Sequence, residues 1–279
     1  MRKLILSSVL LTCLLIMWGG VVRTTGSGLG CPDWPLCHGQ IIPPFEKEVL
    51  IEYTHRLLAS LIGILTIIIC ITVWCKKAWR AKLGKGCIAA FILLLVQALL
   101  GGVTVKSELH PYIVATHLGV AMIFLTIIFW MFLKSNDTPA TRSPQKGYYS
   151  LAHGILILLF FQIVLGGLVA ASNAGLVCPD FPLCGGRWVP VLQGLVALQF
   201  FHRVTAFVLL FALLVFSLGT WKRTLSKMIL LLGFSQVLLG VANVLLGLPL
   251  WVRLSHLAVA TALFLALLAT LYELRPSHN

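Results

Sequence analysis

The residues best able to do chemistry lie in one short stretch, Glu52-Tyr-Thr-His55-Arg56. A carboxylate, an imidazole and a guanidinium stand there at the head of a long apolar run, where ionisable groups are costly and often functional. Glu52 and His55 are three residues apart, so they share one face of a helix. Such a pair could hold a cofactor and move protons. The structural alternative is an interfacial cap, in which Glu52 and Arg56 contact water and lipid headgroups.

Four of the eight histidines recur at equivalent positions of an internal repeat, namely His55 and His117 in the first half and His202 and His256 in the second. A single helical histidine is most often a hydrogen-bonded core residue. A pair at similar depth that occurs twice indicates a site instead, because facing helices of four-helix bundles commonly build metal and cofactor sites.

Two imidazoles per half suit haem iron, because the macrocycle supplies the other four ligands. Zinc would normally add thiolates or carboxylates, and the second half offers no nearby acid. Glycines near the ends of neighbouring apolar runs could let a flat ring approach the backbone. Arg56 and Arg203 could pair with haem propionates, or could instead reach lipid headgroups. We therefore expect one bis-histidine haem site in each half.

The two halves differ beside their first histidine. Glu52-Tyr-Thr-His55 in the first half corresponds to Gln199-Phe-Phe-His202 in the second. A partly buried carboxylate can take part in proton transfer, whereas a neutral amide is not suited to it. We therefore expect chemistry at the first site and electron transfer at the second.

A cysteine-containing loop is also duplicated, since Cys31-Pro-Asp-Trp-Pro-Leu-Cys37 recurs as Cys178-Pro-Asp-Phe-Pro-Leu-Cys184. On the oxidising side of a membrane, the favoured interpretation is a disulfide within each loop, Cys31–Cys37 and Cys178–Cys184. A zinc site with His38 and a redox-active pair are the alternatives, although neither has its usual spacing.

The elements that must position these residues are membrane helices. Of the 279 residues, 59% are hydrophobic and 10% charged, and the apolar runs match the ~20 residues that cross a bilayer. Eight runs are expected to be helices: 4–22, 51–75, 87–105, 112–133, 149–171, 197–220, 227–246 and 252–272.

The net charge of +13 reports topology rather than nucleic-acid binding. Basic residues gather at alternate ends of the eight runs, which marks the cytoplasmic side: Arg2, Lys3, Lys76, Lys77, Arg80, Lys82, Lys85, Lys134, Arg142, Lys146, Lys222, Arg223, Lys227 and Arg275. Both termini are then cytoplasmic, and the four repeated histidines lie near the outer face.

The repeat predicts an all-α integral membrane protein made of two parallel four-helix bundles. An even number of crossings per unit gives both copies the same orientation. We expect a first bundle over residues 1–134, a cytoplasmic linker over 135–148 and a second bundle over 149–279.

These residues together resemble the haem A synthase family, in its bacterial form with eight transmembrane helices. The resemblance covers nearly the whole chain. It depends on Glu52-Tyr-Thr-His55-Arg56, on the loop Thr-Gly-Ser-Gly-Leu-Gly-Cys31-Pro-Asp-Trp-Pro-Leu-Cys37, and on the four repeated histidines. It implies a membrane oxidoreductase that converts a methyl group of haem o to a formyl group by successive hydroxylations, using dioxygen and an external electron donor.

The resemblance also implies roles for individual residues. His55 and His117 would address the iron of the substrate haem o, and His202 and His256 would hold haem b. Glu52 matches the essential glutamate of the family, and Cys31 and Cys37 match a cysteine pair of the family that is linked to activity. The implied location is the plasma membrane, and the implied partners are haem o synthase and a terminal oxidase or its assembly factors.

Other classes of protein fit part of the pattern. A di-haem b-type electron-transfer cytochrome needs the four histidines but gives Glu52 no role. A non-enzymatic haem carrier should show exchangeable haem in either half. A thiol–quinone oxidoreductase would use the outer cysteines and leave the repeated histidines unexplained.

Overall fold

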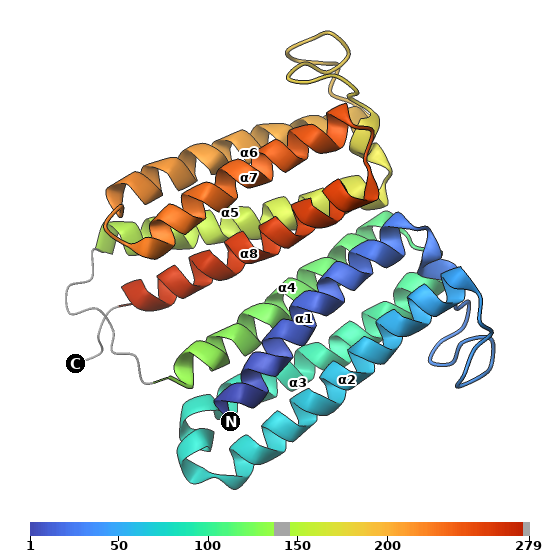
Figure 1. Ribbon diagram of the computed structural model, residues 1–279, viewed down its shortest axis with the longest axis vertical. Helices are drawn as coiled ribbons and strands as arrows, with labels where there is room; N and C mark the ends of the chain where they lie inside the picture. The colour runs from blue at the N-terminus through green and yellow to red at the C-terminus, as the bar shows by residue number, and fades with distance from the viewer. Residues whose placement is uncertain (137–145, 276–279) are drawn as a thin grey trace. The chain divides into compact units, whose positions relative to one another are not determined.

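Long apolar runs form helices because a helix satisfies its backbone polar groups within one segment, as lipid requires. The computed structural model describes residues 1–136 and 146–275. Within these ranges eight helices are long and apolar enough to cross a membrane, and no β-strand is formed (Figure 1). The predicted all-α membrane fold with eight spans is confirmed.

The first compact unit spans Met1–Thr138. Its elements are α1 (Arg2–Thr24), the 3₁₀ turn η1 (Ser27–Leu29), α2 (Lys47–Cys75), α3 (Lys77–Lys106) and α4 (Pro111–Lys134). Helices α1 and α3 each pack against both α2 and α4, so the four helices close into a bundle (Figure 1). One apolar cluster near the N-terminus takes residues from all four helices: Ile5, Ile69, Val73, Leu83, Cys87 and Met131.

The second compact unit, Pro139–Asn279, repeats this arrangement. Its elements are α5 (Lys146–Ala171), η2 (Ala174–Leu176), α6 (Gly194–Gly219), α7 (Thr224–Leu245) and α8 (Leu250–Leu274). Helices α5 and α7 each pack against both α6 and α8. Each unit therefore places its two repeated histidines on its second and fourth helices.

The predicted boundaries differ most at α3, which begins at Lys77 rather than at residue 87. Hydropathy marks only the part of a helix that crosses hydrocarbon, whereas a helix with charged side chains can continue through the headgroup layer. The basic residues Arg80, Lys82 and Lys85 therefore lie on the first turns of α3. The predicted linker, 135–148, falls largely on residues 137–145, which lie outside the described residues.

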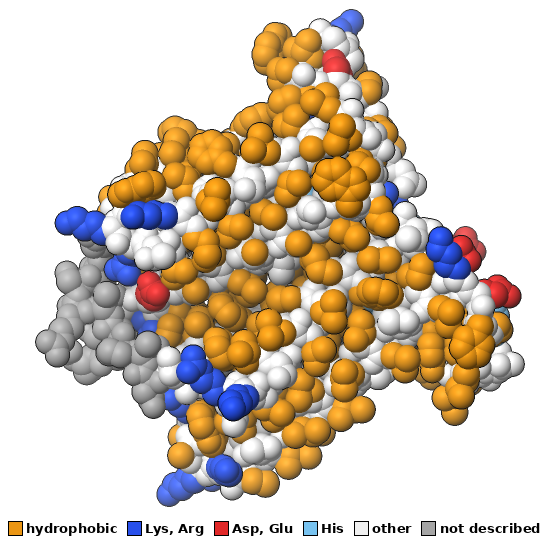
Figure 2. Space-filling model, viewed as in Figure 1, with side chains coloured by type: hydrophobic (Ala, Val, Ile, Leu, Met, Phe, Trp, Pro, Cys, Tyr) orange, Lys and Arg blue, Asp and Glu red, His pale blue; other side chains and the backbone are white. Residues whose placement is uncertain are grey.

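The helix bodies present apolar side chains on their outer surfaces. On α2, for example, Leu57, Leu61 and Ile64 are all exposed. On the face drawn in Figure 2, hydrophobic side chains cover the helix bodies, and Lys and Arg gather toward helix ends. Apolar surface of this extent fits contact with lipid.

Candidate functional site

The four repeated histidines lie inside their own bundles with one ring nitrogen unpaired. The Nδ1 atoms of His55, His117, His202 and His256 are buried, and none has a hydrogen-bond partner among the described residues. Within each unit the two imidazoles are close enough to interact electrostatically. A buried polar atom without a partner is costly and calls for an explanation, such as a bound group.

His153 shows how a structural histidine of the same fold looks. It lies on α5, has no counterpart in the first half, and its Nδ1 atom is 3.0 Å from the carbonyl oxygen of Tyr149, one turn earlier. Its ring is therefore held by its own helix. The four repeated histidines lack a bond of this kind at Nδ1, which sets them apart from the core-residue alternative.

Each repeated histidine lies against a glycine of the preceding helix. A Cβ atom at Gly19 would be 3.2 Å from Cε1 of His55, and one at Gly166 would be 3.0 Å from Cε1 of His202. The same relation joins α3 to α4 and α7 to α8. A Cβ atom at Gly101 would be 3.6 Å from Cε1 of His117, and one at Gly240 would be 3.3 Å from Cε1 of His256. We expected these glycines to make room for a flat macrocycle, and the structure places the imidazole edges directly against them.

Gly166→Val is therefore expected to push His202 out of position and to lower the haem content of the second unit. Gly154→Val on the same helix is the matched control, because a Cβ atom at Gly154 meets nothing within 4 Å. Haem extracted per mole of purified protein is the measurement. Equal haem in both variants would show that the contact between Gly166 and His202 does not matter.

Glutamines brace the histidine-bearing helices. Nε2 of Gln97 on α3 donates to the carbonyl oxygen of His117 at 3.0 Å. Its repeat counterpart, Gln236, lies with Nε2 3.2 Å from Nε2 of His256, so it contacts the ring itself. Gln97 and Gln236 occupy equivalent positions of the internal repeat.

The second unit has an additional brace that the sequence did not indicate. Nε2 of Gln162 on α5 donates to the carbonyl oxygen of His202 at 2.8 Å, and the Thr205 hydroxyl bonds to Oε1 of Gln162. The repeat gives leucine at the corresponding positions of the first half, Leu15 and Leu58. In the sequence, the contact is marked only by two polar residues, Gln162 and Thr205, that replace leucines of the other half.

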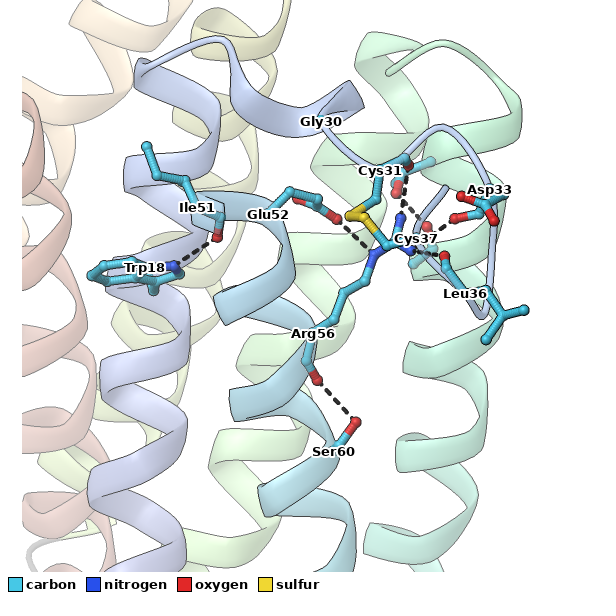
Figure 3. Close-up of polar contacts among 12 residues, drawn as sticks. Trp18, Gly30, Cys31, Asp33, Leu36, Cys37, Ile51, Glu52, Arg56 and Ser60 are labelled. Atoms are coloured by element: carbon cyan, nitrogen blue, oxygen red, sulfur yellow. Dashed lines mark hydrogen bonds and ion pairs between the residues drawn. A yellow bond between two sulfur atoms is a disulfide. The ribbon is translucent and has the colours of Figure 1, made fainter. Parts of the chain in front are cut away.

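Glu52 is buried on α2, at 7% exposure, one turn before His55. Nε of Arg56 donates to its Oε1 at 3.1 Å, and Figure 3 shows both side chains extending from α2 toward the disulfide loop. The equivalent Gln199 is also buried, and its Nε2 donates to the carbonyl oxygen of Gly175 at 3.3 Å. Nε of Arg203 is consequently buried without a partner among the described residues. The charged pair belongs to the first unit.

The rest of the Arg56 guanidinium ties the disulfide loop to α2. Nη1 donates to the carbonyl oxygens of Asp33 and Leu36, at 2.7 and 2.8 Å, and Nη2 donates to that of Cys31 at 3.0 Å (Figure 3). With the bond to Glu52, these contacts use four of the five N–H groups of an arginine.

Arg203 repeats these contacts in the second unit, on the carbonyl oxygens of Cys178, Asp180 and Leu183. Both arginines therefore act as clamps between loop and helix. The propionate contacts expected for Arg56 and Arg203 stay a prediction.

Each loop is also closed by a disulfide and an aspartate. Cys31 is bonded to Cys37, and Cys178 to Cys184, so neither pair presents free thiolates to a metal ion. The Asp33 carboxylate accepts the backbone N–H groups of His38 and Gly39, at 2.6 and 2.7 Å. These bonds, that of Gly39 first, together with the charge of Arg56, hold the pKa of Asp33 below its usual range.

Asp33→Asn is expected to speed reduction of the Cys31–Cys37 disulfide by a few-fold, because one amide oxygen cannot replace two carboxylate oxygens. Since the pKa of Asp33 is lower in the folded loop than in an unfolded one, the two bonds persist at neutral pH. They are lost only as the pH falls below the ordinary aspartate value of about 4. The measurement is the rate at which a phosphine reduces the Cys31–Cys37 disulfide in wild type and in Asp33→Asn, followed by thiol labelling. An unchanged rate at neutral pH would contradict the assignment.

Trp18 is a site residue that sequence reasoning missed. Its indole Nε1 donates to the carbonyl oxygen of Ile51 on α2 at 3.0 Å, directly before Glu52 (Figure 3). It also precedes Gly19, which touches His55. The second half has leucine at this position, so the bond to α2 is specific to the unit that carries Glu52.

Comparison with known proteins agrees with this geometry. Residues 2–50 and 44–268 match the protein family described as cytochrome oxidase assembly protein. A haem A synthase of Halalkalibacterium halodurans is 34% identical over 91% of this chain and 90% of its own. A haem A synthase of Alkalihalophilus pseudofirmus is 33% identical over 95% and 94%. One from Shewanella oneidensis is 29% identical over 94% and 93%. With two buried histidine pairs, a duplicated four-helix bundle and matches of this extent, the chain belongs to the cytochrome oxidase assembly protein family that includes these haem A synthases.

Proposed function

We propose that this protein is a haem A synthase, a membrane oxidoreductase that oxidises a methyl substituent of haem o to a formyl group. The observation that carries the proposal is the asymmetry between the two units. Both keep two buried histidines with an unpaired Nδ1, but only the first adds a buried carboxylate, Glu52, one turn from its histidine. The names of the relatives support the same reaction.

The substrate haem o belongs to His55 and His117, and haem b belongs to His202 and His256. The residues fit a haem in each unit, because the buried imidazoles lack partners at Nδ1 and their ring edges lie against glycines. When bound, haem b supplies one-electron transfer through its iron. Gln162 and Gln236 then hold the two haem b histidines from neighbouring helices.

Glu52 is the proton-transfer residue of the first unit. Each hydroxylation of the methyl group consumes one dioxygen, two electrons and two protons, and it releases one water. The second hydroxylation gives a geminal diol, which loses water to leave the aldehyde. An external donor supplies the electrons. A buried carboxylate beside the disulfide loop (Figure 3) is suited to holding and passing protons. Arg56 and Trp18 fix the helix turn that bears it.

The protein works in the plasma membrane, with both termini cytoplasmic and both haem sites near the outer face. Lys and Arg at alternate helix ends support this orientation. The disulfides in the two loops support an oxidising outer side. Haem o synthase supplies the substrate, and a terminal oxidase or its assembly factors receive haem a.

The test is to identify the haems extracted from the purified protein after expression with and without a source of haem o. We expect haem b alone without the source, and haem o, its hydroxylated intermediate or haem a in addition with it. Haem b alone under both conditions would favour the electron-transfer cytochrome. Exchangeable haem without oxidation would favour the carrier.

A further inference from the structure

The disulfide loop of the first unit is followed by a protruding apolar stretch, residues 41–45, here called the first apolar segment. Ile41, Ile42 and Phe45 are 77%, 68% and 83% exposed. Two prolines, Pro43 and Pro44, lie between them. Loops that face water are normally polar, and neighbouring large apolar side chains at such exposure mark an interaction surface.

The second unit repeats this feature in residues 188–192, the second apolar segment. Trp188, Val189 and Val191 are 74%, 64% and 59% exposed, and Pro190 lies among them. The residue types have changed, because Ile41 corresponds to Trp188 and Phe45 to Leu192, but the apolar character has not. In Figure 1 each loop lies beside the end of its own second helix, α2 or α6.

A hydrogen bond fixes the depth of the first apolar segment along α2. The Tyr53 hydroxyl donates to the carbonyl oxygen of Ile41 at 2.8 Å. Helix α2 has 29 residues and is about 43 Å long, whereas the hydrocarbon layer is ~30 Å thick. Helix α2 ends at Cys75, at its basic end. About twenty residues cross the hydrocarbon layer, and a span of that length that ends at Cys75 begins at Arg56. Tyr53, and with it Ile41, therefore lies at the edge of the hydrocarbon layer.

The first apolar segment also continues the lipid-facing surface of α2. A groove between the loop and α2 is lined by apolar residues, among them Leu36, Ile41 and Leu57, and also by the polar side chains of Gln40, Arg56 and Ser60. Leu57 is itself half exposed and begins the row that Leu61 and Ile64 continue along the span. Exposed apolar side chains of the membrane-spanning helix and of the loop thus meet at this groove.

We propose that both apolar segments lie in the headgroup layer of the leaflet nearest the loops and insert their side chains at the acyl boundary. Prolines suit this position, because they lack the backbone N–H that lipid would leave unpaired. Tryptophan is the residue type most typical of the membrane interface. The partner is phospholipid, and the loops are anchored by it. The proposal depends on the membrane-spanning helices and is independent of the reaction.

The experiment uses the full chain in phosphatidylcholine nanodiscs. Trp188→Phe removes one of eight tryptophans, and the fluorescence lost from wild type reports Trp188. We expect this difference signal to lose most of its intensity with lipids brominated near the headgroup, less with lipids brominated near the chain end, and little with aqueous iodide. Quenching by iodide without quenching by bromolipid would overturn the proposal, and so would quenching by neither, because another part of the protein would then cover the residue.

Ile42→Trp in the Trp188→Phe background tests the first apolar segment independently, with the parent variant subtracted. Phe161→Trp in the same background is the matched control, since Phe161 is 61% exposed in the middle of α5. The control should be quenched more by the deep bromines, and the loop tryptophan more by the shallow ones. A loop tryptophan quenched only by iodide would overturn the proposal for this unit.

Discussion

Glu52→Gln is expected to lower the conversion of haem o to haem a by about 10²-fold or more, the usual contribution of a positioned proton-transfer group. Haem b content should stay at the wild-type level. Glutamine keeps the shape of the side chain and can still accept the N–H of Arg56, but it cannot exchange a proton at neutral pH. The measurement is the ratio of haem a to haem o extracted after expression with a haem o source.

The protein contains its own control for the fold of this variant. Gln199 occupies the equivalent position of the second unit, where it is 4% exposed within the same loop and helix arrangement. A buried glutamine is therefore compatible with this environment. Loss of haem from Glu52→Gln would make Glu52 a structural residue. Retention of more than about a tenth of the activity would remove it from proton transfer.

His202→Ala is expected to remove nearly all haem b from the purified protein, because one of the two histidines proposed to hold it is lost. Conversion of haem o should stop for lack of electron transfer. The thermal midpoint should also fall, since a ligand that binds only the folded state stabilises it. Extracted haem b per mole of protein and a thermal melt in detergent provide the measurements.

Two variants make this result specific. His55→Ala should keep haem b and lose only the oxidation of haem o, because it belongs to the other unit. His153→Ala should keep both, because His153 is bonded to its own helix at Tyr149. If His55→Ala and His202→Ala lost haem b equally, the division of labour between the units would be wrong.

Much of the fold follows from the sequence alone. Eight apolar runs determine eight helices, because lipid leaves the backbone no partner outside the helix. Comparing the two halves identified the histidine pairs, because they are retained in both copies. The same comparison identified the change from Glu52 to Gln199, because it is a difference between otherwise matching segments. The helix ends could not be placed in the same way, since α3 continues through charged residues from Lys77.

The tertiary structure alone decided which side chains meet. In a membrane helix the core face and the lipid face are both apolar, so hydropathy carries little information on how each helix is rotated. The contact of Gly166 with His202 and the bond from Trp18 to Ile51 depend on that rotation. The clamp formed by Arg56 depends on loop carbonyls that any residue type would provide. Every residue has a backbone carbonyl, so the sequence does not show which carbonyls an arginine will contact. The link that Arg56 makes between the disulfide loop and Glu52 is therefore visible only in the tertiary structure.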